Sequence, residues 1–192
     1  MFEVFKNYLN GLVSLSDEQY ELIRSVAVQK RVRKKQFLLQ EGEIWDSYIF
    51  VCSGCLRQFR VDHKNAEWTL YFALEKWWLT DPESRLSNKP TIFNIDALED
   101  SVVLIFKKHD FDSLKKAIPE FSDLIELLAY RNLIAIQNRL YDLVSKTAEE
   151  RYSHLIATHP VCINRAPLHM IASYLGLSPF TISRIRNQIV RS

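Results

Sequence analysis

The stretch that most constrains how this chain folds is residues 167–190, whose pattern is typical of two short helices joined by a tight turn. Gly176 stands between the two, and glycine readily takes the left-handed backbone conformation that ends a helix. Ser178 and Pro179 then match an N-cap and a first helical residue. Apolar side chains fall where crossing helices would share a core, namely Ile171, Ala172, Leu175, Leu177, Ile182 and Ile185. The stretch predicts a helix-turn-helix with 178–190 as the recognition helix, and an ordinary hairpin of two helices is the alternative.

The predicted outer face of the second helix carries polar and cationic side chains that suit phosphates and base edges. The candidates for DNA contact are Ser178, Phe180, Thr181, Ser183, Arg184, Arg186, Asn187 and Gln188. Among them, Phe180 offers only an apolar contact, whereas the guanidinium of Arg184 can grip the two acceptors of a guanine. Arg186 points about 200° away from Arg184 on the helix, so we expect it to reach a phosphate or to pack at the rim.

Charge is divided unevenly along the chain. Residues 151–192 contain five arginines and no acidic residue, which leaves 20 of the 25 cationic residues against all 23 acidic ones in residues 1–150. A basic C-terminal segment on an acidic body is typical of a module that binds a polyanion. The alternative interpretation is that these arginines lie on a surface that only faces solvent.

Strand signals dominate residues 26–106, after two predicted helices at 2–13 and 17–25. Short runs rich in β-branched and aromatic residues alternate with Gly, Asn, Asp and Ser, a texture typical of many short strands. The expected strands lie near residues 27–33, 36–39, 47–52, 55–61, 67–73, 91–97 and 101–107. Their spacing predicts an antiparallel β-roll of the jelly-roll type.

A long helix is predicted at 120–148, after a short one at 108–118. Its first apolar stripe has heptad spacing and comprises Leu127, Tyr130, Ile134, Gln137, Tyr141, Val144 and Ala148. A second stripe on a neighbouring face comprises Ile125, Ala129, Leu133, Ile136, Leu140 and Leu143. One stripe can pack on the roll, and the simplest partner for the other, over 127–148, is the same helix of a second chain. Coverage of both stripes within one chain is the alternative.

Together these parts predict an α+β fold: an antiparallel β-roll (a double-stranded β-helix or jelly roll), a long dimerisation helix and a C-terminal helix-turn-helix domain. We expect the roll at 1–118, the long helix at 119–148 and the DNA-binding domain at 149–192, which another helix near 149–158 begins. The chain has no apolar run of membrane-spanning length and no signal-peptide pattern, and its three cysteines, an odd number, fit a reducing compartment. We therefore expect a cytoplasmic protein with no membrane partner.

Three segments are similar to pieces of a known family. Residues 40–54, with Gly42 and Gly54, look like the paired glycines of its roll; residues 148–156 look like the start of its DNA-binding domain; residues 178–186 look like its recognition helix. On these segments, and on the order of parts over essentially the whole chain, the sequence resembles the bacterial CRP/FNR family of transcription regulators. The resemblance implies a homodimer that binds double-stranded DNA sequence-specifically, with RNA polymerase as a further partner.

The roll departs from the family pattern where its cyclic-nucleotide binders hold their ligand. Those proteins have a Gly-Glu pair followed, at a set distance, by an arginine that pairs with the cyclic phosphate. Here Asp81 takes the place of the acidic residue, and Thr91 stands where the arginine is expected. We therefore expect a sensor domain that does not bind cAMP. A different, unknown small-molecule effector would lie between the roll and the long helix, with Trp78, Asp81, Arg85, Thr91 and Gln137 as candidate contacts.

Other functions have less support in the sequence. Cys52 and Cys55 form a C-x-x-C pair at a predicted turn, but no second pair of metal ligands accompanies them, so we interpret both as structural and expect no metal. We expect no cofactor; haem ligation stays open, because five histidines are present without a distinctive spacing. The roll lacks the histidine–carboxylate cluster of jelly-roll enzymes, so we do not expect an enzyme. The alternative function is a dimeric ligand-sensing or protein-interaction module whose helix-turn-helix is degenerate.

Overall fold

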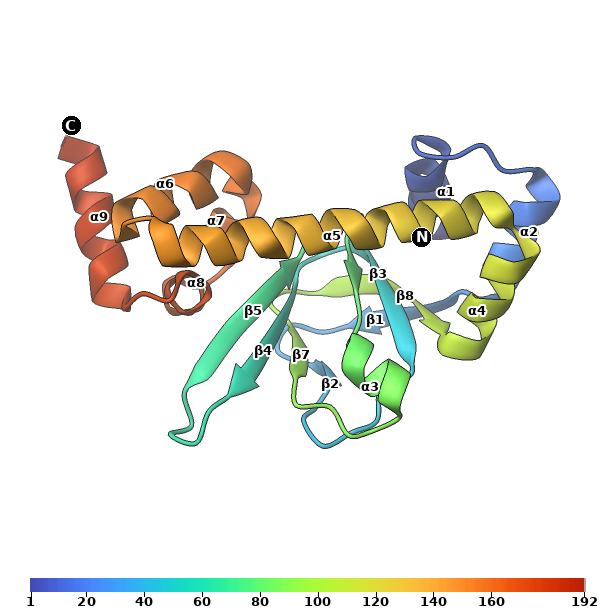
Figure 1. Cartoon of the computed structure of the whole chain (residues 1–192), viewed down its shortest axis with the longest axis horizontal. Helices are drawn as coiled ribbons and strands as arrows, with labels where there is room; N and C mark the ends of the chain where they lie inside the picture. The colour runs from blue at the N-terminus through green and yellow to red at the C-terminus, as the bar shows by residue number, and fades with distance from the viewer. Residues whose placement is uncertain (192) are drawn as a thin grey trace.

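The computed structural model describes the backbone of residues 1–191 and the side chains of residues 1–188 (Figure 1). The chain begins with helices α1 (Phe2–Asn10) and α2 (Asp17–Val26). The strands follow as β1 (Val28–Val32), β2 (Phe37–Leu39), β3 (Ser47–Ser53), β4 (Leu56–Val61), β5 (Glu67–Ala73), β6 (Trp78–Leu79), β7 (Asn94–Ala97) and β8 (Ser101–Lys107), with helix α3 (Pro82–Ser87) between β6 and β7. The remaining helices are α4 (Lys108–Ala117), α5 (Pro119–Ser145), α6 (Ala148–Thr158), α7 (Pro160–Arg165), α8 (Leu168–Leu175) and α9 (Pro179–Arg191).

The strands form two four-stranded sheets that share one apolar core. The strand order is β1-β8-β3-β6 in the first sheet and β2-β7-β4-β5 in the second, and every pair of neighbours is antiparallel. The interior between the sheets is filled by Val32, Leu38, Leu39, Ile49, Val51, Leu56, Ala73, Leu79, Ile95, Ala97 and Val103. This arrangement confirms the predicted α+β fold with an antiparallel roll.

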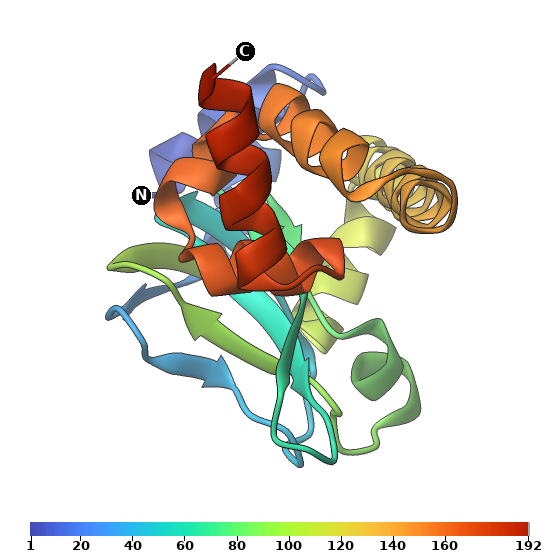
Figure 2. The same cartoon turned by 90° about the vertical axis from the view of Figure 1, so that its left-hand side faces the viewer.

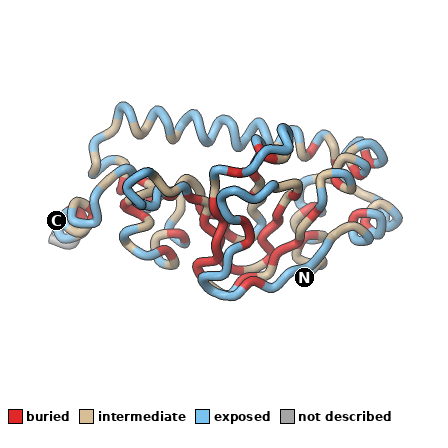
Figure 3. Tube along the Cα trace, turned by 90° about the horizontal axis from the view of Figure 1, so that it is seen from below, coloured by how far each residue is buried: buried red, intermediate tan, exposed pale blue. Residues whose placement is uncertain are grey.

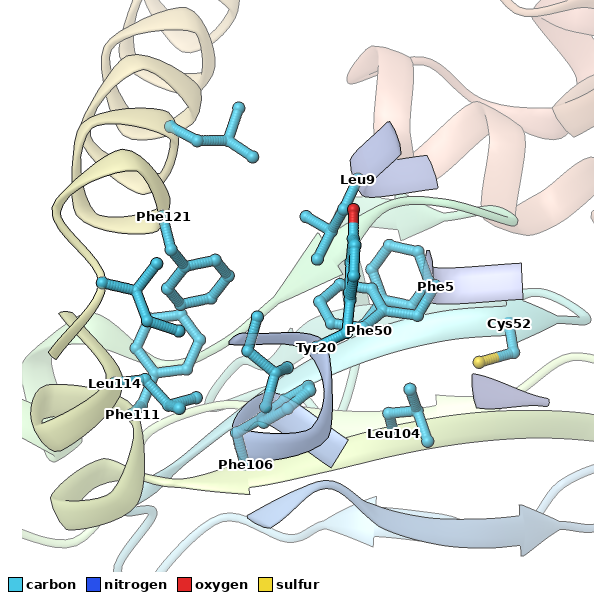
Figure 4. Close-up of a cluster of buried hydrophobic side chains, with 13 residues drawn as sticks. Phe5, Leu9, Tyr20, Phe50, Cys52, Leu104, Phe106, Phe111, Leu114 and Phe121 are labelled. Carbon is cyan, nitrogen blue, oxygen red and sulfur yellow. The ribbon is translucent and has the colours of Figure 1, made fainter. Parts of the chain in front are cut away.

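A second, aromatic core joins α1, α2 and α4 to the roll and to the start of α5 (Figure 4). The ring of Phe5 in α1 lies 4.7 Å from that of Phe50 in β3, and Phe111 in α4 lies 5.4 Å from Phe121 in α5, between ring centroids. Burial of a Phe side chain contributes about 1.5–3 kcal/mol to folding, so this cluster anchors the first turns of α5 firmly to the roll.

Most of α5 is not covered by the rest of the chain (Figure 3). Its buried side chains, Phe121 and Leu124, belong to the first turns. Further along, Ile134 of the first predicted stripe is 55% exposed and Leu140 of the second is 61% exposed. The expectation that one stripe packs on the roll is therefore wrong for most of that stripe. Only its first residue, Ile125, packs against the aromatic core, because α5 runs past the roll towards the C-terminal helices (Figure 1).

The long helix ends at Ser145 and not at residue 148 as predicted. Lys146 is extended, and a capping box starts α6 immediately afterwards. The hydroxyl of Thr147 accepts a hydrogen bond from the Glu150 N–H (3.2 Å), and the Glu150 carboxylate accepts one from the Thr147 N–H (2.8 Å). Ala148 therefore belongs to α6, and the heptad stripe ends at Val144.

Three short elements, β6, α3 and α7, have no counterpart among the predicted ones. Each is too short to show a periodic apolar pattern: α3 and α7 have six residues each and β6 has two. Among the described residues, no helix has the length and apolar character that a membrane span requires.

Candidate nucleic-acid interface

The helix-turn-helix forms as its local signals predict. Gly176 ends α8 in the left-handed region at φ 64°, and the Leu177 N–H donates to the Ala172 carbonyl at 2.9 Å. The hydroxyl of Ser178 accepts a hydrogen bond from the Thr181 N–H at 3.1 Å, which is the expected N-cap of α9. The predicted shared core is present too: Ile171, Ala172, Leu175, Ile182 and Ile185 are buried, and Leu177 packs against them.

The outer face of α9 divides the eight predicted DNA contacts into two groups. Four side chains are held by the protein itself. The hydroxyls of Ser178 and Thr181 lie 2.9 Å apart and bond to each other, and the Ser183 hydroxyl donates to the Pro179 carbonyl at 3.0 Å. The Nε of Arg186 donates to the hydroxyl of Tyr152 at 2.6 Å. The other four, Phe180, Arg184, Asn187 and Gln188, are exposed.

The two arginines of the described part of α9 therefore differ in environment. Arg186 is half-buried against the ring of Tyr152 in α6, which matches the expectation that it packs at the rim. Arg184 is exposed and makes no ion pair with any residue whose side chain is described. A guanidinium that is already ordered by an internal hydrogen bond is poorly placed to read a base, so Arg184 is the better candidate for that task.

The helix-turn-helix is attached to both the roll and the long helix. Arg139 of α5 donates to the carbonyl of Leu70 in β5 (2.5 Å) and to that of Tyr174 in α8 (2.7 Å). The hydroxyl of Ser173 in α8 accepts from the Thr69 N–H in β5 at 2.8 Å. These contacts leave α9 uncovered: Figure 2 shows it in front of the other elements at this end of the molecule.

A buried apolar cluster also crosses from the C-terminal helices to the roll. Phe72, Leu74 and Cys55 of the roll share it with Leu155 and Cys162 of α6 and α7. A pocket at this junction is lined by Phe72, Leu74, Trp77, Leu155, His159, Cys162 and Tyr174, and it has room for about one water molecule. The C-terminal helices are therefore packed on the roll through a buried apolar contact.

Two residues of the predicted effector site, Asp81 and Thr91, are bonded to each other inside the roll. The Thr91 hydroxyl donates to the Asp81 carboxylate. The same carboxylate caps α3 by accepting from the N–H groups of Glu83 (3.0 Å) and Ser84 (3.2 Å). Asp81 is only 1% exposed, so its oxygens are already engaged inside the protein.

The other three candidate effector contacts have different surroundings, although the Arg85 N–H donates to the Asp81 carbonyl at 3.1 Å. Trp78 belongs to the aromatic core, with its ring 5.3 Å from Phe50. The guanidinium of Arg85 lies over the ring of Tyr48 at 4.5 Å. Gln137 is exposed on α5. Aromatic packing and helix capping thus already engage Trp78, Arg85 and Asp81 within the protein, and an effector site made by these residues stays a prediction.

The two cysteines of the C-x-x-C pair point into different cores. Cys52 lies in the aromatic core, and Cys55 lies in the cluster shared with the C-terminal helices. Burial raises the pKa of the Cys52 thiol to about 11 and that of Cys55 to about 12. Both thiols thus stay protonated and unreactive near neutral pH, in agreement with the structural interpretation.

Two residues of this region escaped the sequence analysis. Arg139 belongs to neither apolar stripe of the long helix, and nothing in its spacing along the sequence marks it for a special role. Arg165 of α7 forms ion pairs with Glu75 and Glu99, which lie in two turns of the roll. No pattern in the sequence links positions so far apart.

Comparison with known proteins matches this architecture. Residues 29–117 match the family model described as the cyclic nucleotide-binding domain. FixK2 from Bradyrhizobium japonicum superposes with a TM-score of 0.74 at 18% identity, covering 86% of this chain and 85% of that one. The c-di-GMP responsive global regulator CLP from Xanthomonas campestris gives a TM-score of 0.73 at 11% identity, covering 92% of each chain. A transcriptional regulator assigned to the CRP/FNR family, from Eubacterium rectale, gives 0.70 at 18% identity, covering 96% and 88%. No curated protein sequence matches the chain.

Proposed function

We propose that this chain, which carries a domain of the cyclic nucleotide-binding family and has the fold of the CRP/FNR transcription regulators, is a homodimeric, sequence-specific DNA-binding regulator. The observation that carries the proposal is α9: a capped helix with an exposed face of Phe180, Arg184, Asn187 and Gln188, held at the end of α5. Two of the solved structures with this fold, CLP and the protein from Eubacterium rectale, are named as regulators.

The charges of the C-terminal region support DNA as the partner. Residues 151–192 carry arginines and no acidic residue, so a polyanion meets no repelling carboxylate within this segment. The Nε of Arg186 is held by a hydrogen bond to Tyr152, which leaves Arg184 as the exposed cation among the described side chains of α9. Among the described side chains of α9, an exposed guanidinium and two exposed amides on the outer face suit readout in the major groove.

The exposed apolar surface of α5 supports a dimer. Tyr130, Ile134, Tyr141 and Val144 recur at heptad spacing and are each more than half exposed. A soluble monomer rarely leaves such a continuous apolar stripe in water, and a second α5 is the simplest complement. A parallel pair of α5 helices would place two copies of α9 at the same end of the dimer, as a two-fold symmetric operator requires.

For the roll, we propose that cAMP is not the effector. The Asp81 carboxylate is bound to Thr91 and to the first turn of α3, so it is not available for a ribose hydroxyl. Thr91 cannot supply the charge-assisted pair that an arginine forms with a cyclic phosphate. RNA polymerase is a proposed partner that rests on the fold alone. A small-molecule effector other than cAMP is likewise a proposal that rests on the fold.

The alternative is a dimeric sensor or protein-interaction module with a degenerate helix-turn-helix. Phe180 favours it, because an exposed phenylalanine on a reading face is also what a protein contact would use. Two experiments separate the DNA-binding regulator from this alternative. The purified protein first selects duplexes from a random library, and fluorescence anisotropy then measures its affinity for the enriched and the scrambled duplexes. Enrichment of a two-fold symmetric sequence is expected. Equal affinity for both duplexes, or no binding, would favour the alternative.

A further inference from the structure

Phe180 is the outermost apolar side chain of the recognition helix. It is 79% exposed in the first turn of α9, directly after the Ser178 cap. Most of the other large apolar side chains that are more than half exposed lie on α5, where the proposed second copy of the chain would cover them. Phe180 belongs instead to α9, which lies at the opposite end of the molecule from α1 and α2 (Figure 1). Its exposure therefore needs a separate partner.

The exposed residues of α9 place Phe180 in line with the candidate base reader. Phe180, Arg184 and Asn187 follow one another at spacings of four and three, so they lie on one side of the helix. The side chains beside this line, Thr181 and Ser183, are half-buried, and their hydroxyls are bonded within the domain. The surface that α9 offers to a groove thus begins with an apolar ring and continues with a guanidinium and an amide.

The edges of base pairs in the major groove offer one apolar group, the methyl on carbon 5 of thymine. A ring that enters the groove beside an arginine raises the affinity when it covers this methyl group. It lowers the affinity when it faces an unmethylated pyrimidine or a polar edge. We propose, on the basis of the proposed DNA-binding function, that Phe180 reads the 5-methyl group of a pyrimidine in the operator. The same methyl is present on 5-methylcytosine, so the protein distinguishes methylated from unmethylated cytosine at this position.

Helix geometry limits where the methylated pyrimidine lies. Four residues of α-helix rise about 6 Å, which is less than two base-pair steps of about 3.4 Å each. With Arg184 on a guanine, the pyrimidine read by Phe180 lies within about two base pairs of that guanine. Burying one methyl corresponds to about a fourfold gain in affinity for each half-site, or roughly fifteenfold for a two-fold symmetric operator.

A contact with another protein is the competing explanation for an exposed Phe180. The adjacent residues favour DNA, because Arg184 and Asn187 on the same line are typical groups for base edges. The whole segment from residue 151 onward also lacks acidic residues, as a DNA-facing surface should.

The test uses the full-length protein and the duplex enriched from the random library. Each thymine of one half-site, and its symmetry mate, is replaced in turn by uracil, which lacks only the methyl group. Wild-type protein is expected to lose about fifteenfold in affinity at one position and little at the others. Cytosine at that position should bind more weakly than 5-methylcytosine by a similar factor, with guanine opposite in both duplexes.

The variants assign the effect to Phe180. Phe180→Ala should bind the thymine and uracil duplexes equally, whereas the control Gln188→Ala should keep the preference for thymine. Because Phe180 is exposed, its variant should melt at the wild-type temperature, and a circular-dichroism melt checks this. If wild type binds every uracil duplex as tightly as the thymine duplex, or Phe180→Ala still discriminates, the inference is wrong while sequence-specific binding stands. If no duplex is enriched at all, the proposed function itself fails.

Discussion

The terminal nitrogens of Arg165 lie 2.8 Å from the two carboxylate oxygens of Glu75, so α7 is clamped to the turn between β5 and β6. A second carboxylate, that of Glu99 before β8, is also paired with this guanidinium. Bidentate pairs of this kind fix orientation as well as distance. The clamp therefore sets how the helix-turn-helix sits on the roll, and with it the direction in which α9 faces.

The first prediction concerns the stability of this clamp. Hydrogen bonds from Arg165 lower the pKa of the Glu75 carboxyl from 4.5 to about 2. A lowered pKa means that the ionised carboxylate stabilises the fold above about pH 4.5 and that this contribution is lost as the pH falls towards 2. Arg165→Met should destabilise the protein by about 1 kcal/mol at neutral pH, a modest value because Glu75 is partly exposed and salt screens the pair.

Urea unfolding of wild type, Arg165→Met, Glu75→Gln and the double variant measures the coupling between the two side chains. Lys107→Met serves as the control, because its ion pair with Asp46 is exposed and does not bridge to the C-terminal helices. A coupling energy near zero at low salt would mean that the clamp does not hold the two parts together.

The second prediction concerns the dimer. Ile134→Asp places a charge in the middle of the α5 stripe, and burying an unpaired carboxylate in an interface is costly. The variant should be a monomer at micromolar concentration, as measured by light scattering or sedimentation. Leu86→Asp is the control, since Leu86 is also a large apolar residue, is 71% exposed and lies on α3. An unchanged mass for Ile134→Asp would rule out this stripe as the interface.

Local sequence signals predicted most of the fold because they act over a few residues. Gly176 and Ser178 set the turn and cap of the helix-turn-helix through their own backbone and hydroxyl, and the structure has both as expected. The strand runs fell close to their predicted positions because alternating apolar residues meet one filled interior. The end of α5 was misplaced, because Thr147 and Glu150 form a capping box inside a continuous apolar pattern.

The candidate effector site was beyond such signals. The sequence pattern does not reveal that the Asp81 carboxylate caps α3, because this helix is too short to show a periodic pattern. Trp78 was placed between roll and long helix, but it packs among phenylalanines from α1, β3, β8 and α4. The hydrogen-bond and packing partners of a buried side chain come from segments that are distant in the sequence. The spacing of residues along the chain does not identify these partners.

The third prediction concerns cyclic nucleotides. Titration calorimetry of the protein with millimolar cAMP should give no binding heat, because Asp81 is already engaged and Thr91 carries no charge for the phosphate. Thr91→Val removes a donor from a buried carboxylate and should destabilise the fold by about 1–3 kcal/mol. Ser87→Ala is the control, since its hydroxyl donates to a carbonyl on the exposed side of α3. Micromolar affinity for cAMP would contradict the prediction.

The fourth prediction separates the two arginines of α9. Arg184→Ala should lose about 1–3 kcal/mol on the enriched duplex and little on a scrambled one, because it removes a base contact and relaxes the preference at one position. Arg186→Ala breaks the hydrogen bond to Tyr152, so we expect it to lower thermal stability and to weaken both duplexes alike.

Anisotropy titrations at several salt concentrations, paired with thermal melts, distinguish these effects. The salt dependence shows how many phosphates each variant still contacts, since each lost phosphate contact lowers the slope by about one. Tyr152→Phe is the control for Arg186, because it removes the accepting hydroxyl and leaves the cation in place. It should reproduce the stability loss of Arg186→Ala with an unchanged salt slope. Equal losses of Arg184→Ala on both duplexes would make that arginine a phosphate contact and would leave base reading to Phe180, Asn187 and Gln188.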